Sequence, residues 1–210
     1  MILLGIFVLL KMFEKRQGSQ ANKIIKRVAD VYSPSYSILI ILLKPSTEIK
    51  ILLEDIYKSS GYEIDRVTNK TDSFAKWNDK IYFDTKKLRK GIIELKESVV
   101  LNDPESVLLA NHEICKQLSK ELNCKILTGI WERISWTVML DIYEEGNMIS
   151  TTSVTEGKAD IDNVNPDNDL LKKPDGDNLK VVLWKHGLST DELFNKADLQ
   201  IIEYRMRSTK

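Results

Sequence analysis

Two side chains with acid–base and nucleophilic chemistry lie three residues apart at the start of a predicted helix. Asn111 can cap a helix over 111–123, which places His112 in the first turn and Cys115 one turn later. A histidine beside a cysteine can activate the thiol, and the free amides of a helix start can bind a ligand. Cys115 shares its helical face with apolar residues, however, and a buried thiol is inert. His112 and Cys115 are therefore weak catalytic candidates.

The same residues do not predict a metal site. His112, Cys115 and Cys124 have the spacing H-x2-C-x8-C, which lacks a fourth ligand and matches no zinc pattern. The segment 157–178 is rich in Asp, Asn, Pro and Gly, but its acid and amide alternation from Asn163 has proline where an EF-hand needs glutamate. Glycine-rich phosphate loops and hydrolase signatures are absent from the sequence. We expect no metal and no cofactor.

Another candidate site interrupts the most strand-like part of the chain, residues 128–146. Glu132 and Arg133 are adjacent there, and Trp131 and Trp136 lie on either side of them. Glu132 is a weak catalytic candidate because a carboxylate inside an apolar strand is typical of a functional site. The two tryptophans and Arg133 are candidate binding residues.

Two geometries are open for this segment. A turn or bulge at the charges would pair 124–131 with 134–144 as a hairpin and leave both charges in water. A continuous bent strand would bury Glu132 on one apolar face. Burial of a carboxylate costs several kcal/mol of folding free energy unless the group is paired. We favour the turn, because it avoids the buried charge.

Composition excludes a charge-driven function. The chain has 210 residues, of which 42% are hydrophobic and 30% charged, as in ordinary globular proteins. Its 31 basic and 31 acidic residues cancel, so no global field attracts nucleic acid. We expect no nucleic-acid partner.

The N-terminal segment 1–32 combines an apolar run with a basic one. Nine residues after Met1 are too few for a membrane-spanning helix, which needs about 20. Residues 11–27 carry six basic residues and one acid, a local charge of +5. Three interpretations are open: a packing segment of the core, a non-native start with Met12 as the true one, or an anchor by which residues 1–27 touch an anionic membrane.

Hydrophobic periodicity and turn signals divide the rest of the chain into elements. We predict strands at 36–43, 62–68, 80–85, 106–110, 124–130, 148–155 and 199–206. We predict helices at 46–60, around Leu88, Ile92 and Leu95, at 111–123, and over a stretch that ends at Gly187, followed by a turn capped by Ser189. Residues 101–105 are expected to be a break, and 157–178 a mobile acidic loop.

These elements predict an α+β fold with a mixed sheet of about seven to eight strands and three to five helices. The order strand–helix–strand–strand occurs twice, which suggests two halves, 33–103 and 104–210. A single domain over 33–210 is the alternative.

The absence of a catalytic motif favours a non-enzymatic function. We expect a cytoplasmic, bacterial-type accessory protein that binds or regulates another protein through an exposed strand edge or the acidic loop. One alternative is a small-ligand protein or hydrolase with a pocket at the 110–115 helix start near Glu132. The other is a peripheral membrane protein held by residues 1–27.

Overall fold

The computed structural model describes residues 36–82, 88–103, 111–132, 137–156, 158–159, 171 and 176–209. Ser35–Lys210 form one compact unit. The predictions for the N-terminal segment 1–32 and for a strand at 106–110 lie outside the described residues, as does most of the predicted loop 157–178.

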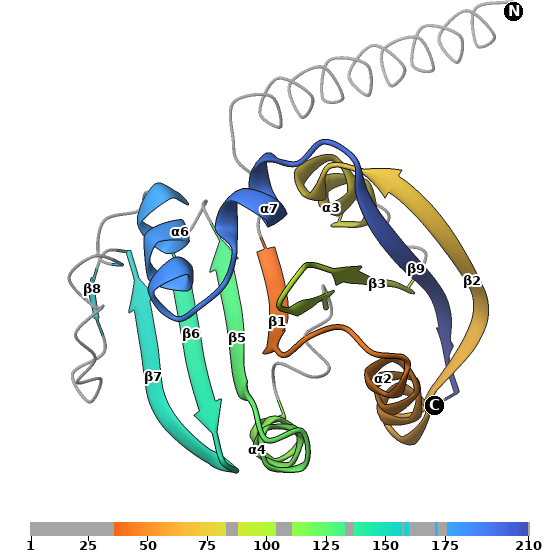
Figure 1. The fold of residues 1–210 in the computed structure, drawn as a ribbon, viewed down its shortest axis with the longest axis horizontal. Helices are drawn as coiled ribbons and strands as arrows, with labels where there is room; N and C mark the ends of the chain where they lie inside the picture. Colours follow the sequence, from red (N-terminus) through yellow and green to blue (C-terminus); the bar gives the residue numbers. More distant parts are fainter. Residues whose placement is uncertain are drawn as a thin grey trace, which may run out of the picture. The chain divides into compact units, whose positions relative to one another are not determined.

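A single antiparallel sheet forms the centre of this unit, with the strand order β2-β9-β3-β4-β1-β5-β6-β7-β8 (Figure 1). The strands are β1 (Tyr36–Leu42), β2 (Tyr62–Asp72), β3 (Leu88–Glu94), β4 (Val99–Asn102), β5 (Lys125–Glu132), β6 (Thr137–Glu144), β7 (Asn147–Thr155), β8 (Lys158–Ala159) and β9 (Leu199–Ser208). All pairings within the described residues are antiparallel, so the prediction of a mixed sheet was wrong in this respect.

Helices cover both faces of the sheet. Those in the described residues are α2 (Thr47–Ser59), α3 (Phe74–Tyr82), α4 (His112–Glu121), α6 (Gly176–Lys185) and α7 (Thr190–Asn195). The central strand β1 shows why two layers are needed. Ile38 and Ile40 are buried in the cluster that contains α3, α6 and α7, whereas Leu39 and Ile41 are buried in the cluster that contains α2 and α4. A continuous apolar run is what a strand buried on both faces requires.

Two predicted elements in the first half of the chain were wrong. Residues 80–85 were expected to be a strand, but α3 extends to Tyr82. Residues 88–95 were expected to be a helix, but form β3, where Ile92 and Ile93 are buried on opposite faces. Gly91 explains the error, because it leaves the space in which the Trp77 ring of α3 packs against the strand. The predicted break at 101–105 was wrong for Leu101 and Asn102, which belong to β4.

The last strand crosses the boundary between the two predicted halves. β9 lies between β2 and β3 and pairs with both (Figure 1). Strands from 33–103 therefore need a strand from 104–210 to form a continuous sheet, and the described residues do not form two separate halves.

The predicted pairing of 124–131 with 134–144 as a hairpin is confirmed, and the connection at 133–136 lies outside the described residues. β5 ends at Glu132 and pairs with β6 along its whole length, with Glu132 opposite Thr137. The alternative of one continuous bent strand is wrong. A second hairpin turns at Glu145 and Gly146 and leads into β7, the strand predicted at 148–155. Gly146 has a positive φ of 81°, a conformation that favours glycine.

Candidate functional site

The start of α4 holds the imidazole of His112 against the sheet. Asn111 caps the helix, since its Oδ1 accepts a hydrogen bond from the amide of Ile114 at 3.2 Å. His112 then lies over β6, where its Nδ1 is 2.6 Å from the phenolic oxygen of Tyr143. The His112 side chain is 54% exposed, so its ring is both oriented and accessible.

Polar groups on β6 and β7 extend this contact into a network. The Asp141 carboxylate lies two residues before Tyr143 on the same face of the strand. Its Oδ2 is 3.5 Å from the Tyr143 hydroxyl, which donates to it, and 3.8 Å from Nδ1 of His112. Its Oδ1 accepts a hydrogen bond of 2.6 Å from the hydroxyl of Thr151 on β7. The network thus connects α4, β6 and β7.

Burial keeps the Tyr143 phenol protonated. It raises the pKa of Tyr143 well above its ordinary value, and the negative charge of Asp141 adds to the shift. Because the phenolic proton is donated to Asp141, the phenolic oxygen accepts from Nδ1–H of His112, which leaves Nε2 of the ring turned away from this contact. This arrangement presents an oriented imidazole nitrogen, Nε2, to a molecule that binds beside α4.

The structure gives Cys115 the properties of a core residue. Its side chain, on the inward face of α4, is fully buried in the core, and this burial raises the pKa of the thiol to about 12. The thiolate needed for nucleophilic attack is therefore scarce at neutral pH. His112 is hydrogen-bonded to Tyr143, whereas the sequence suggested Cys115 as its partner.

Glu132 and Trp131, which the sequence also suggested as site residues, lie elsewhere in the sheet. Glu132 and Ile126 lie six residues apart on β5, about 20 Å along an extended strand, and Ile126 pairs with Tyr143. Glu132 is thus far from His112 along the sheet. Trp131 is 5% exposed and belongs to the core on the opposite face of β5. Arg133 and Trp136 lie outside the described residues.

The sequence analysis missed Tyr143, Asp141 and Thr151. Their signal was alternation, because polar side chains at Asp141 and Tyr143 recur with a period of two within an apolar strand. Thr128 of β5 and Thr151 of β7 lie opposite Asp141 in the sheet, so three adjacent strands place polar groups side by side. Strand register cannot be read from one sequence, and for this reason the network was not predicted.

The sheet surface beside His112 combines polar and apolar groups. Met139 pairs with Ser153, and Met148 pairs with Tyr143, so these side chains share the face of the Asp141–Thr151 pair. Met139 and Met148 are each 42% exposed. We call the surface formed by His112, Met139, Met148, Thr151 and Ser153 the β6–β7 face.

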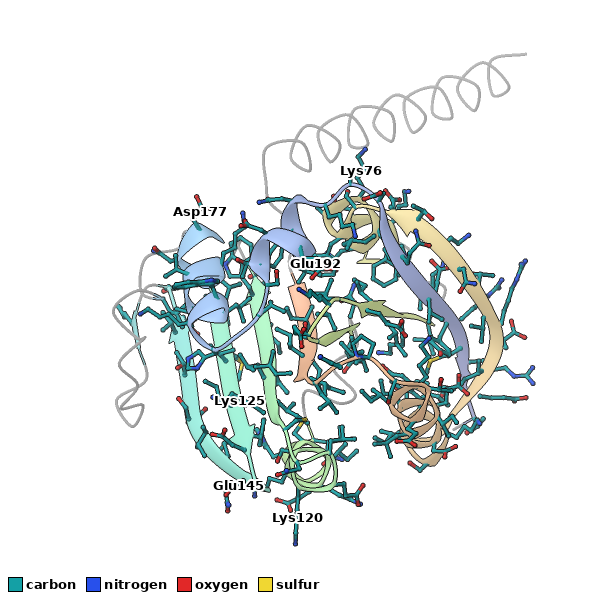
Figure 2. All side chains as sticks on the ribbon, viewed as in Figure 1. Lys76, Lys120, Lys125, Glu145, Asp177 and Glu192 are labelled. Atoms are coloured by element: carbon teal, nitrogen blue, oxygen red, sulfur yellow. The ribbon has the colours of Figure 1, made fainter. Side chains whose placement is uncertain are left out.

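Helix α4 borders this face and is fixed to the turn between its two strands. The hydroxyl of Ser119 accepts a hydrogen bond of 2.9 Å from the amide of Gly146. Lys120 of α4 and Glu145 of the turn lie at the same end of the unit (Figure 2). The position of His112 over β6 is therefore held at both ends of the helix, by Tyr143 and by Ser119.

Among the described residues, no group of three or more His, Cys, Asp or Glu side chains is arranged to hold a metal ion. No helix in the same part of the chain is long and apolar enough to cross a membrane. Comparison of the chain with protein-family models, curated proteins and solved structures finds no match.

Proposed function

We propose that this protein is a non-enzymatic accessory protein that binds another protein through the β6–β7 face. The observation that carries this proposal is the position of two half-exposed methionines, Met139 and Met148, on the sheet face that also receives the oriented imidazole of His112. Single exposed apolar residues are ordinary on protein surfaces, whereas two on one sheet face beside an ordered polar group are typical of a binding surface.

The side chains of this face suit a protein partner. Methionine is flexible and polarisable, so it adapts to an apolar partner surface without a preformed pocket. His112 contributes specificity, because the contacts with Tyr143 and Asp141 hold its ring before a partner arrives. The polar pair Asp141–Thr151 lies between the two methionines, which gives the face the mixed apolar and polar composition of many protein interfaces.

Affinity purification from the native cell tests this proposal when variants are compared side by side. Met139→Glu places a charge in the face and should reduce recovery of the partner at least tenfold, while His112→Ala should reduce it several-fold. Ile51→Glu is the matched control, since Ile51 is 55% exposed on α2 and lies outside the β6–β7 face. Equal recovery of every co-purified protein by Met139→Glu and Ile51→Glu would overturn the proposal.

The His112 network also supports a second candidate function, in a ligand-binding protein or hydrolase. A histidine hydrogen-bonded to a tyrosine and close to a carboxylate has the geometry of a general base that could activate water. His112→Ala would then abolish turnover of a substrate found by metabolite screening, while Met139→Glu would leave partner recovery unchanged.

Membrane contact through residues 1–27 stays a prediction, because this segment lies outside the described residues. Co-sedimentation with anionic liposomes, with the full chain compared to one that starts at Tyr32, tests it.

A further inference from the structure

The strand β2 forms one edge of the sheet over eleven residues. Within the described residues it pairs with β9 alone, and this pairing is regular from Arg66 to Asp72 after a bulge near Ile64. The outer side of an edge strand presents backbone amides and carbonyls that can pair with another strand. Val67, 49% exposed, lies within the regular part.

We propose that β2 pairs with β2 of a second copy of this chain, antiparallel and with Asn69 opposite Asn69. A twofold axis through this residue places Arg66 opposite Asp72, Val67 opposite Thr71 and Thr68 opposite Lys70. Each pair occurs twice, because the interface is formed by the same surface of both copies.

Charge complementarity selects this register. The outward amides of an edge strand alternate, so a twofold antiparallel pairing must be centred on a residue rather than between two residues. Centring on Thr68 would place Arg66 opposite Lys70, and centring on Lys70 would place two copies of Lys70 opposite each other. Centring on Asn69 instead places opposite charges together at both ends of the paired segment, which stabilises cross-strand pairs.

The apolar and β-branched residues fit the same register. Val67 and Thr71 are both exposed, and the pairing would cover the valine with the threonine of the other copy. Asp72 already forms an ion pair with Lys80 of α3 at 2.5 Å, and its side chain is 19% exposed. Arg66 of the other copy would therefore approach this carboxylate as a second cation, from the strand edge. Because one strand pair forms a small interface, the dimer should be weak and should dissociate on dilution.

Cysteine cross-linking tests the register directly. Asn69→Cys, in a Cys124→Ser background, should form disulfide-linked dimers under mild oxidation, because directly opposite residues of an antiparallel pair have Cα atoms about 4.5–5.5 Å apart. Val67→Cys alone should not, since its partner is Thr71, whereas a mixture of Val67→Cys and Thr71→Cys chains should cross-link. Failure of Asn69→Cys to cross-link faster than Val67→Cys overturns the proposal.

Charge exchange gives a second, independent test by sedimentation velocity. Arg66→Asp should raise the dimer dissociation constant at least tenfold, and the double variant Arg66→Asp with Asp72→Arg should restore dimerisation at least in part. A wild-type chain that is monomeric at every concentration would contradict the proposal. The interface is independent of the β6–β7 face, so Met139→Glu should leave the dimer unchanged.

Discussion

The phenolic oxygen of Tyr143 on β6 lies 2.6 Å from Nδ1 of His112 on α4, and this contact joins the helix start to the sheet. The same hydroxyl also donates to Asp141 at 3.5 Å, from a fully buried ring. Tyr143→Phe removes this hydroxyl, so His112 and Asp141 each lose one hydrogen-bond partner. We expect the free energy of unfolding to fall by about 1–3 kcal/mol, the usual effect of removing one partner from a buried hydrogen bond.

Urea denaturation measures this change, and the nuclear magnetic resonance signal of the His112 ring reports its orientation. His112→Ala serves as a control for stability, because its side chain is half exposed and its loss should have a smaller effect. An unfolding free energy of Tyr143→Phe equal to that of the wild type would show that the network does not stabilise the fold.

The close packing of Trp77 on Gly91 predicts a large difference between two glycine substitutions. A Cβ atom at Gly91 would lie 1.8 Å from Cη2 of Trp77, whereas one at Gly129 would find its nearest neighbour at 3.8 Å. Gly91→Ala should therefore lower the free energy of unfolding by about 3 kcal/mol, because an overpacked core must shift. Gly129→Ala should change it by less than about 1 kcal/mol. Thermal and urea unfolding of both variants check this, and similar values for the two would contradict the packing of α3 on β3.

The ion pair between Lys90 on β3 and Asp103 after β4 is fully buried. Replacement of Lys90 removes the opposite charge from this buried pair, so Lys90→Met should lower the free energy of unfolding by about 3–5 kcal/mol. The double variant Lys90→Met with Asp103→Leu should be more stable than Lys90→Met alone, because the second buried charge is removed as well.

A double-mutant cycle in urea measures this coupling between Lys90 and Asp103. The exposed pair between Lys50 and Glu94 is the control, and Lys50→Ala should change stability by about 1 kcal/mol or less. Additive effects of the Lys90 and Asp103 substitutions would contradict a direct interaction between them.

Stability should fall at alkaline pH partly through Cys115. Burial raises the pKa of its thiol from 9.0 to about 12. A pKa that is raised in the folded state stabilises the fold fully below the unfolded value of 9.0, and this contribution is lost as pH rises toward 12. Cys115→Ala lacks this contribution at every pH. The difference in unfolding free energy between the wild type and Cys115→Ala should therefore shrink above pH 9. A deficit that is constant from pH 7 to pH 10.5 would contradict this assignment.

Local signals were enough to predict the elements that carry strong periodicity or clear caps. The helix after Ser46 and the helix after Asn111 form as expected, and in both the cap oxygen accepts from an amide three residues later. The hairpin at Glu132 was predicted because the alternative required a buried charge. These features depend on residues that are close in the chain.

The errors occur where distant residues decide the structure. β3 was taken for a helix because Leu88, Ile92 and Leu95 recur with helical spacing, but the ring of Trp77 and pairing with β9 make it a strand. In the candidate site, His112 was identified while Tyr143 and Asp141 were not. The contact between them depends on the packing of α4 across β6, which no local pattern encodes.

Oxidation of Met139 and Met148 tests the β6–β7 face most directly, because both residues are 42% exposed in the chain alone. The oxidation rates are measured by mass spectrometry after brief peroxide treatment of the free protein and of the complex purified from the native cell. Met206, 4% exposed, is the buried reference. We predict that both methionines oxidise readily in the free protein and at least fivefold more slowly in the complex. Equal rates in the two samples would contradict a partner that binds at the β6–β7 face.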